Sequence, residues 1–532
     1  MENKQRYMRV PVTRTIPAVK DPVEVFRILK GLSKQVFMLE SLEDKKEWGR
    51  WTFLGYDPTL EVSCAGGNLR VKNGSTFEIV TDDPGAYLKK MVEENRTPVI
   101  GGLPPLTGGL VGYFSFDFIK YAEKTLRGAG GLAGVSERED NKEAANTGTF
   151  HEETFKDFDL MLFDTLIVFD NLSDTIMLIV NVKTDAEAEN RKRAEAELAM
   201  MENIVRNGEK VVFPPLLLQS AWNELFSRDE YCRMVEKAKR HIIEGDVFQV
   251  VLSNRLDARA EGSLFDTYLA LRRINPSPYM FYFASDDVEI AGASPETLVK
   301  LKEGVLHTFP LAGTRPRGKT ADEDTYLEKD LLADEKEKAE HNMLVDLGRN
   351  DLGKISEFGS VKVEKYLSIE RFSHVMHIGS TVRGLIKENK TALDAIDAVL
   401  PAGTLSGAPK IRACQIIADL ERCPRGIYGG AIGYIDFSGN MDTCIAIRLA
   451  FKKNGRVFVR SGAGIVADSV PEREYEECRN KMQAVVNALE EVAKPRRGKE
   501  GNDSAAFATG NQAAAGMGDG ASSRTPSGAG PR

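Results

Sequence analysis

The sequence predicts an α+β fold in two large halves, because segments with helical periodicity are interleaved with strand-like segments along the whole chain. Two helices are expected to begin at capping boxes, at Thr184 and at Ser227, each followed three residues later by Glu. The halves also carry a similar glycine-rich segment, since residues 108–116 and 429–437 agree at five of nine positions. Glycine-rich strands are common, so chance explains this match as well as duplication does.

Turn and cap signals divide the chain into predicted elements. A strand, a turn at 170–174 and a second strand follow residue 158, as in a hairpin. The first capping box opens a helix that ends at Gly208, and the second opens a helix that ends at Gly245. A glycine-rich strand opens the segment 107–123, and further strands are predicted at 247–253, 279–284, 305–309, 431–437 and 443–451.

Composition sets the boundaries between the parts of the chain. Residues 1–210 form the N-terminal half, and a proline-containing stretch leads into the C-terminal half at 220–494. The polar segment 127–149 is expected to be a flexible insertion. Residues 495–532, rich in Gly, Ala and Ser, are expected to be a disordered tail, since they offer too little apolar surface to order themselves.

Charge and hydropathy exclude several classes of protein. The chain has 532 residues, 42% of them hydrophobic, so it can bury a large core, and its net charge is −8. It has no polybasic stretch that would follow nucleic acid or anionic lipid, and no apolar run long enough for a bilayer span or a signal sequence. The six cysteines lack the C-x-x-C spacing of a zinc cluster. We therefore expect a soluble, cytoplasmic protein with no nucleic-acid or membrane partner.

Two predicted helices each carry a pair of acids on one face. In the helix after residue 470, Glu474, Glu477 and Lys481 lie at positions i, i+3 and i+7, and residues 334–341 repeat the Glu-x-x-Glu spacing. Such pairs usually mark a solvated face with ion pairs, but these adjoin apolar or tight segments, including an expected turn at 462–464. Two such helices facing each other would offer one hard cation the carboxylates of Glu337, Glu340, Glu474 and Glu477.

A series of short motifs in the second half resembles the chorismate-utilising enzymes. The motifs occur in the order seen in that family, cover most of the chain from about 227 to 494, and are specific as a set although each is weak alone. They are GDVFQVVLS at 245–253, GASPE at 292–296, PLAGTR at 310–315, RNDLG at 349–353, SHVMH at 373–377, PAGTLSGAPK at 401–410 and MDTCIAIR at 441–448. The resemblance implies a fold of the anthranilate and aminodeoxychorismate synthase type, with large antiparallel sheets sandwiched by helices.

The family's substrate accounts for the charged residues. Chorismate is a small dicarboxylate, so its site must neutralise two anions, place a nucleophile at one ring carbon and help a hydroxyl leave from another. The resemblance implies that Glu340 and Glu477 ligate Mg²⁺, with Glu337 and Glu474 close by. Mg²⁺ keeps several waters and takes few protein ligands, which suits this sparse set. The metal would hold the ring carboxylate.

The remaining site residues are also implied by the resemblance. Glu296 is the expected general acid that protonates the departing hydroxyl, with His377 assisting nearby and Thr404 orienting the site. Lys481 is either a ligand contact or a counter-charge to Glu477. An arginine fork would hold the enolpyruvyl carboxylate together with a tyrosine and backbone amides. The expected substrate-binding residues are Gly313, Thr314, Tyr428, Arg448, Gly462, Ala463 and Gly464.

Two positions favour one branch of the family. Isochorismate and salicylate synthases have a lysine at the position of Gln249 that activates water, and an amide cannot act as that base, which points to ammonia as the nucleophile. Aminodeoxychorismate synthases typically have a covalent nucleophile, lysine, at the position of Ala312. The chain therefore resembles the large subunits of anthranilate synthases. In these lyases of tryptophan biosynthesis, ammonia adds at C2 of chorismate to give 2-amino-2-deoxyisochorismate, water leaves from C4, and pyruvate is eliminated to give anthranilate.

The same resemblance implies regulation and a partner. No cysteine lies in the Gly-x-Cys-x-Gly turn of a glutaminase, so a separate glutamine amidotransferase subunit, component II, is expected to supply ammonia. Two segments resemble a feedback site for L-tryptophan. Without the family resemblance, they would be interpreted as an ordinary strand end beside a proline turn. Their residues are Leu39, Glu40, Ser41, Asn275, Pro278, Tyr279 and Met280.

Two alternative functions stay open at this point. The nearer one is an aminodeoxychorismate synthase of folate synthesis, against which Ala312 argues. The other, from a different class, is a catalytically inactive amino-acid sensor that keeps only the tryptophan site. The intact set of four acids on the two helices argues against the sensor.

Overall fold

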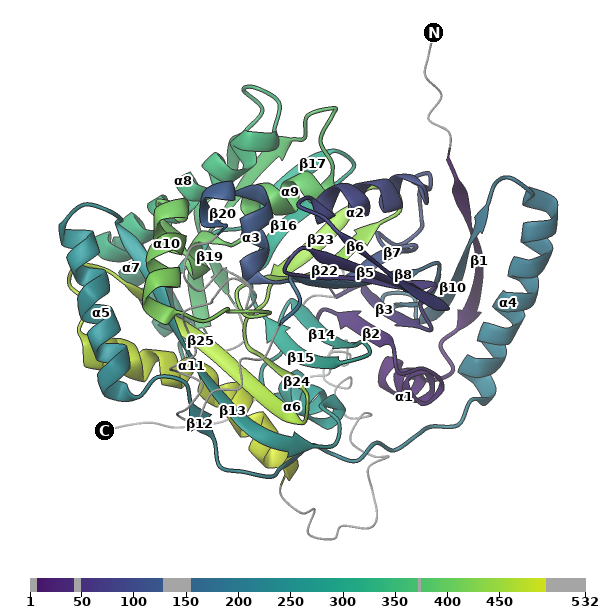
Figure 1. Ribbon diagram of the computed structural model, residues 1–532, viewed down its shortest axis with the longest axis horizontal. Coiled ribbons are helices and arrows are strands. Elements are labelled where there is room, and N and C mark those ends of the chain that lie inside the picture. Colours follow the sequence, from purple (N-terminus) through teal and green to yellow (C-terminus); the bar gives the residue numbers. More distant parts are fainter. Residues whose placement is uncertain (1–6, 43–48, 128–154, 372–374, 494–532) are drawn as a thin grey trace, which may run out of the picture. The chain divides into compact units, whose positions relative to one another are not determined.

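The structure is a computed structural model that describes residues 7–42, 49–127, 155–371 and 375–493. The predicted insertion at 127–149, apart from its first residue, and the predicted tail at 495–532 lie outside the described residues. Within them, the chain forms two large sheets covered by helices (Figure 1). The prediction of an α+β fold with large antiparallel sheets sandwiched by helices is therefore confirmed.

The first sheet has 13 strands. They are β1 (Arg9–Pro17), β2 (Val36–Glu40), β3 (Trp51–Tyr56), β9 (Thr165–Asp170), β10 (Thr175–Lys183), β11 (Leu217–Leu218), β12 (Asn223–Glu224), β13 (Gln249–Glu261), β14 (Tyr279–Ala284), β15 (Val288–Ser294), β21 (Gly407–Ala408), β24 (Leu449–Lys453) and β25 (Arg456–Ile465). Their order is β1-β10-β9-β3-β2-β14-β15-β24-β25-β13-β11, and β12 and β21 also pair with β13.

The second sheet has 12 strands. They are β4 (Leu60–Ala65), β5 (Asn68–Asn73), β6 (Ser75–Val80), β7 (Gly109–Phe114), β8 (Phe158–Phe163), β16 (Thr297–Lys302), β17 (Val305–Thr308), β18 (Leu311–Pro316), β19 (Lys362–Arg371), β20 (Val375–Leu385), β22 (Ala431–Asp436) and β23 (Met441–Ile445). Their order is β18-β20-β17-β16-β23-β22-β7-β8-β4-β5-β6, and β19 pairs with β20.

Helices cover the outer face of each sheet, and the two inner faces pack on each other. The helices are α1 (Pro22–Leu32), α2 (Pro84–Glu93), α3 (Ile119–Ala122), α4 (Glu187–Asn207), α5 (Arg228–Ile243), α6 (Phe265–Ile274), α7 (Ala321–Ala333), α8 (Glu335–Ile355), α9 (Ala392–Val399), α10 (Lys410–Glu421) and α11 (Pro471–Ala493). Strand β14 shows the layering. Met280 and Tyr282 pack into the core beneath the helices, whereas Phe281 and Phe283 pack into the core between the sheets.

Both predicted halves contribute strands to both sheets. In the first sheet, β2 pairs antiparallel with β14, and in the second, β7 pairs antiparallel with β22. The β7–β22 pair consists of the two similar glycine-rich segments, with Gly112 directly opposite Gly433. A Cβ on Gly112 would lie 2.0 Å from the Asp159 carbonyl oxygen of the next strand, so the backbones approach too closely there for a side chain.

The local predictions near residues 158–245 are largely confirmed. Strands β9 and β10 form the predicted hairpin, and Ser227 caps α5 through a complete capping box. The capping box at Thr184 was wrong: α4 begins at Glu187 without a side-chain cap at Ala186, and the Thr184 hydroxyl donates to the carbonyl oxygen of Tyr7 instead, at 3.1 Å.

Two further predictions need correction. The strand expected at 443–451 is two strands in different sheets, β23 and β24, because the chain crosses between the sheets at Ala446, Ile447 and Arg448. Arg448 adopts φ +52°, the left-handed region, which breaks the extended conformation. The glycines at 462–464 form no turn but belong to β25, paired with β13.

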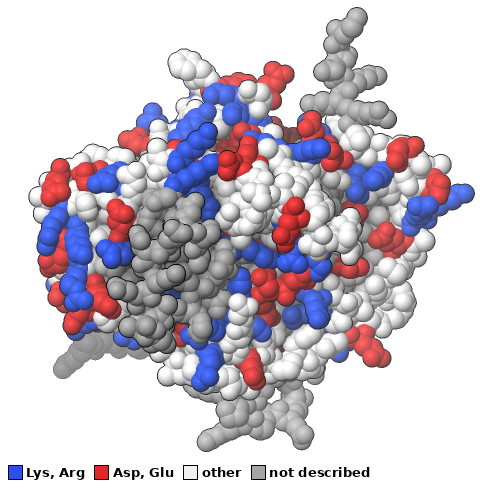
Figure 2. All heavy atoms as spheres, in the orientation of Figure 1, with Lys and Arg blue, Asp and Glu red and all other residues white. Residues whose placement is uncertain are grey.

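The charged surface is mixed where it can be viewed. On the face shown in Figure 2, lysine and arginine side chains are interspersed with aspartate and glutamate. Among the described residues, no helix combines the length and the apolar composition that crossing a bilayer requires.

Candidate active site

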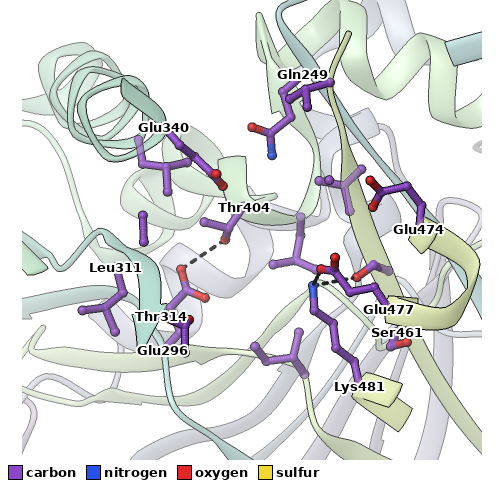
Figure 3. A pocket seen from close by; sticks show the side chains of 18 of the residues that line it. Gln249, Glu296, Leu311, Thr314, Glu340, Thr404, Ser461, Glu474, Glu477 and Lys481 are labelled. Carbon is purple, nitrogen blue, oxygen red and sulfur yellow. Dashed lines mark hydrogen bonds and ion pairs between the residues drawn. The ribbon is translucent and has the colours of Figure 1, made fainter. Parts of the chain in front are cut away.

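One cavity of about 980 Å³ brings the predicted catalytic, substrate-binding and metal-binding residues together. Strands β13, β18, β20 and β25 contribute residues to its wall, and helices α8 and α11 contribute the acid pairs. Of the residues predicted for these three roles, all line the cavity except Ala463, whose side chain lies in the core beneath the helices. The acids of α8 and α11 approach the cavity from opposite sides (Figure 3).

A hydrogen bond joins Thr404 to Glu296 in the cavity. The Thr404 hydroxyl donates to Oε1 of Glu296 at 3.1 Å, shown as a dashed line in Figure 3. Burial of the Glu296 carboxyl raises its pKa to about 7, although the hydroxyl of Thr404 and the charges of Arg448 and Lys481 act in the opposite direction. A carboxyl in this state is protonated over much of the neutral range and can donate a proton to a leaving hydroxyl.

The cross-over between the sheets presents Arg448 to the cavity. The residue follows β23 and precedes β24, and its left-handed backbone turns the side chain out of the strand direction. Desolvation lowers the pKa of the guanidinium, while the nearby Glu296 raises it. Because an arginine remains protonated in proteins, Arg448 supplies a fixed positive charge for a carboxylate.

The ring of His377 is held at the cavity wall by β18. Its Nδ1 lies 2.7 Å from the carbonyl oxygen of Gly313 and 3.2 Å from Oγ1 of Thr314. A carbonyl oxygen only accepts, so Nδ1 carries the hydrogen. Burial lowers the pKa of His377, which keeps the imidazole neutral. Gly313 itself has φ +65°, and a Cβ there would meet Leu331 at 2.9 Å and Glu337 at 3.2 Å.

Strand β25 shapes the cavity floor through its alternation. Gly462 and Gly464 line the cavity, and Ala463 between them points to the opposite face of the sheet. A Cβ on Gly464 would lie 2.7 Å from Nε2 of Gln249, and a Cβ on Gly462 would lie 3.0 Å from the hydroxyl of Tyr428. The two glycines therefore leave the space in which those polar side chains stand.

Gln249 lines the cavity and has a buried polar atom that lacks a hydrogen-bond partner among the described residues. It begins β13, its side chain points toward the cavity (Figure 3), and it is only 5% exposed. Its Oε1 is buried and accepts no hydrogen bond within the described structure. A buried acceptor without a partner costs free energy unless a ligand donates to it.

The four carboxylates of α8 and α11 have the charge that would attract a divalent cation, but not the close spacing of a complete set of ligands. Burial raises the pKa of Glu340 and of Glu474, and the neighbouring carboxylates of Glu337 and Glu477 respectively add to this. Such repulsion favours a cation in the cavity. No three of these acids place ligand atoms within 4.8 Å of one another in the described chain. The acids are therefore too far apart for a closed cage, and an ion held here would need water or substrate oxygens to complete its shell, as Mg²⁺ does.

Lys481 acts as a counter-charge to Glu477. Its Nζ lies 2.7 Å from Oε1 of Glu477 and donates to the carbonyl oxygen of Gly462 at 3.2 Å. A separate group that could hold an ion, His241, Glu244 and Asp246, lies outside the cavity lining. There, Asp246 already accepts from Arg412 at 2.6 Å, so this group is an ion-pair network.

The two segments predicted to bind an amino acid lie side by side. Strands β2 and β14 pair with Leu39 opposite Phe281 and with Glu40 opposite Met280. The backbone N–H of Leu42, just after Ser41, donates to Ser277, which lies between Asn275 and Pro278. These contacts join the segments into one region, but they do not test a role in binding.

Side chains of this region are largely engaged within the fold. The buried Glu40 accepts from the hydroxyl of Tyr268 and from Nε of Arg272, the latter at 2.7 Å. The hydroxyl of Tyr279 donates to Asp442 at 2.8 Å, and Met280 is fully buried in the core. Glu40 therefore fixes the position of β2 against α6.

Sequence reasoning missed Arg460, which also lines the cavity. The side chain is buried in β25 and pairs with Glu421 at 2.8 Å. Its signal in the sequence is similar to that of Arg448, an arginine that directly follows apolar residues, here Val457-Phe458-Val459. No recognised motif contains it, so the pattern alone did not single it out.

Comparison with known families fits this geometry. The family model for chorismate binding enzymes matches residues 42–487, which span nearly all of the two sheets and the whole cavity. The chain belongs to this family. Relatives within it include the anthranilate synthase component 1 of Acetivibrio thermocellus, 42% identical over 92% of this chain and 97% of that protein. The component 1 of Aquifex aeolicus is 41% identical over 91% of this chain and 96% of that protein.

Solved structures of similar proteins share the fold. Anthranilate synthase component I from Streptococcus pneumoniae superposes with a TM-score of 0.68 at 36% identity, covering 82% of this chain and 92% of that one. The menaquinone-specific isochorismate synthase of Escherichia coli has a TM-score of 0.63, over 92% of this chain and 97% of that one. At 19% identity, the second likeness concerns the fold alone.

Proposed function

We propose that this chain is the chorismate-converting component of an anthranilate synthase. It combines chorismate with ammonia to form anthranilate and pyruvate through 2-amino-2-deoxyisochorismate, in the first step of tryptophan biosynthesis. Relatives at about 40% identity over most of the chain bear the name anthranilate synthase component 1, which supports this assignment. The chemistry of the cavity supports it independently.

The observation that carries the proposal is the pairing of an acid with an unpartnered acceptor in one cavity. Glu296, with its pKa raised to about 7, holds the proton that a leaving hydroxyl needs. The buried Oε1 of Gln249 lacks a donor within the described structure, and ammonia can donate to it while its lone pair faces the ring. The amide of Gln249 cannot deprotonate water, so the cavity suits ammonia better than water as the nucleophile.

The other cavity residues bind and orient the substrate. Arg448 and the hydroxyl of Tyr428 would hold the enolpyruvyl carboxylate, with Gly462 and Gly464 leaving room for it. Mg²⁺, held by Glu340 and Glu477 with Glu337 and Glu474 nearby, would neutralise the ring carboxylate and polarise the leaving group. Neutral His377 would stay beside the ring as a hydrogen-bonding group. Thr404 keeps the Glu296 carboxyl turned toward the cavity.

Partner, regulation and location complete the proposal. The designation component 1 among the relatives supports a second subunit, for which we propose a glutamine amidotransferase that delivers ammonia. The adjoining segments on β2 and β14 would bind L-tryptophan and inhibit turnover by favouring one arrangement of the enzyme over another. We place the reaction in the cytoplasm, because the six cysteines are free, as is usual in a reducing compartment.

The test is an assay of the purified chain with chorismate, Mg²⁺ and an ammonium salt. Anthranilate, followed by its fluorescence, should form without the partner, should disappear when a chelator removes Mg²⁺, and should decrease when L-tryptophan is added. Formation of 4-amino-4-deoxychorismate would reassign the chain to the aminodeoxychorismate synthases. Consumption of chorismate only to isochorismate would show that water is the nucleophile.

A further inference from the structure

A buried cluster of three charged residues adjoins the cavity, and one of them, Arg460, lines it. Glu421, Arg425 and Arg460 have side chains that are at most 1% exposed. Arg425 makes a two-pronged contact with Glu421, through Nε to Oε2 at 2.9 Å and through Nη2 to Oε1 at 2.6 Å. Nη2 of Arg460 also donates to Oε2 of this carboxylate, at 2.8 Å. We call these three residues the buried triad.

The carboxylate of the triad has its hydrogen-bonding capacity filled. Besides the two arginines, Glu421 accepts from the backbone N–H and the hydroxyl of Ser253, at 2.8 and 2.9 Å. Its pKa is lowered, because the two guanidinium groups outweigh the effect of burial. A buried carboxylate with five donors is rigid, and so are the arginines that it orients.

Arg425 uses its remaining donors on two catalytic segments. Its Nη1 donates to the carbonyl oxygen of Leu405 at 2.6 Å, next to Thr404. Its Nη2 donates to the carbonyl oxygen of Val251 at 2.7 Å, two residues after Gln249. The guanidinium also stacks over the ring of Phe116, 4.5 Å from the ring centroid. The side chain of Arg425 therefore links the segment that contains Thr404 to strand β13, which contains Gln249.

We propose that Arg425 is a positioning residue for the reaction, which holds Thr404 against Glu296 and sets the distance between that pair and Gln249. This inference rests on the proposed function and adds to it a residue that touches neither substrate nor cofactor. The carbonyl of Leu405 belongs to a short 3₁₀ turn, Gly403–Leu405, which also packs against α8, β21 and β25. Without Arg425, that turn loses its bond to the rigid triad.

A double-mutant cycle between Arg425→Lys and Thr404→Val tests the proposal. Lysine keeps the charge but cannot reach Glu421, Leu405 and Val251 together, because it lacks the planar fork. Anthranilate formation is measured against pH at a fixed, saturating concentration of unprotonated ammonia. The readouts are kcat and the midpoint of the alkaline limb of kcat/KM for chorismate, where Glu296 loses its proton.

Arg425→Lys should lower kcat by between about tenfold and 100-fold, the effect of a displacement of roughly 1 Å at a reacting group. It should also shift the alkaline limb to higher pH, because the hydrogen bond from Thr404 stabilises the Glu296 carboxylate and its loss raises that pKa. Thr404→Val should cause the same shift. The double variant should shift no further than either single variant, since both remove one interaction.

A matched control separates positioning from general loss of stability. Arg9 is also a buried arginine with a carboxylate and a carbonyl acceptor, Asp164 and Asn181, and it stacks over Phe437, but it does not line the cavity. Arg9→Lys should lower the melting temperature without moving the alkaline limb. If Arg425→Lys proves insoluble, Phe116→Leu removes the ring under the guanidinium and should produce a smaller shift in the same direction.

The outcomes distinguish this proposal from the proposed function. The native chain could make anthranilate while neither Arg425→Lys nor Phe116→Leu shifts the alkaline limb of kcat/KM. The effects of Arg425→Lys and Thr404→Val could also simply add. Either result would mean that Arg425 only stabilises the fold and that the positioning role is wrong. If the native chain makes no anthranilate from chorismate and ammonia, the proposed function itself fails, whatever the variants do.

Discussion

The ammonium group of Lys481 lies 2.7 Å from the carboxylate of Glu477, one turn away on the same face of α11. We propose that Glu477 is the acid of this helix that binds the metal, and Lys481 already neutralises that carboxylate. The charge of Lys481 also opposes the increase that burial causes in the pKa of Glu340, across the cavity, and of Glu296. Lys481 would thus compete with a divalent ion for these acids.

This competition predicts that Lys481→Met binds Mg²⁺ more tightly than the native chain. The gain should be up to about fivefold, the equivalent of one exposed ion pair. Calorimetric titration of the chorismate-free protein with MgCl₂ measures it. Lys338→Met removes a comparable helical ion pair, with Glu335, from outside the cavity lining and should change nothing. Equal or weaker Mg²⁺ binding in Lys481→Met would exclude competition.

Replacement of the acid should separate activity from stability. Glu296→Gln should lower kcat by about 10²- to 10⁴-fold, because an amide cannot protonate the leaving hydroxyl. The native carboxyl has a pKa raised from 4.5 to about 7, so its contribution to stability is present below pH 4.5 and is lost as the pH rises to about 7. Glu296→Gln should therefore gain stability over the native chain through this range, and the gain should level off above it.

Urea denaturation across the pH series measures that gain. The exposed carboxylate of Glu93 on α2 provides the control, because Glu93→Gln should follow the native pH dependence. A constant difference between Glu296→Gln and the native chain from pH 4.5 to 8 would mean that the Glu296 carboxyl is not desolvated.

Two neighbouring glycines should respond differently to the same substitution. In Gly464→Ala, the new Cβ would lie 2.7 Å from the end of the Gln249 side chain, which can move, so the melting temperature should change little while KM for ammonia rises. In Gly462→Ala, the Cβ would lie 2.7 Å from the backbone carbonyl oxygen of Leu252, which cannot move without disturbing the β13–β25 pairing. Gly462→Ala should therefore lose stability by about 1–3 kcal/mol.

Steady-state kinetics at varied ammonia and thermal denaturation of both variants test this contrast. An unchanged KM for ammonia in a well-folded Gly464→Ala protein would remove Gln249 from the ammonia site. Equal losses of stability in the two variants would mean that backbone atoms, and not a movable side chain, exclude a Cβ at both positions.

The region of β2 and β14 offers a test of feedback inhibition. Glu40→Gln weakens the contacts that Arg272 and Tyr268 make with β2, so the segment carrying Ser41 should lose its fixed position. The concentration of L-tryptophan needed for half inhibition should rise about tenfold or more, while activity without tryptophan stays close to native. Glu61→Gln, at a buried acid paired with Lys156, is the control. Unaltered inhibition in Glu40→Gln would place the tryptophan site elsewhere.

The sequence allowed most of the fold and the cavity lining to be predicted, but not the places where the chain changes sheet. The apolar run at 443–451 has the pattern of one buried strand, and nothing in it indicates that β23 and β24 belong to different sheets. The break is a backbone conformation at Arg448, φ +52°, in the left-handed region that non-glycine residues seldom adopt.

The glycines at 462–464 show the opposite ambiguity. Glycine suits a turn as well as a strand with crowded neighbours, and only the pairing of β25 with β13 decides between them. The buried triad was unpredictable for a related reason. In the sequence, Glu421 and Arg425 look like surface charges, and only the assembly of β13, α10 and β25 buries them with Arg460.

The most direct test of the central claim is the identity of the product that carries nitrogen from ammonia. The purified chain, supplied with chorismate, Mg²⁺ and ¹⁵N-labelled ammonium, should form one labelled anthranilate for each pyruvate that it releases. Mass spectrometry measures the label, and a pyruvate assay measures the release. Labelled 4-amino-4-deoxychorismate without pyruvate, or an unlabelled isochorismate, would contradict the proposal that this cavity adds ammonia at C2 of chorismate.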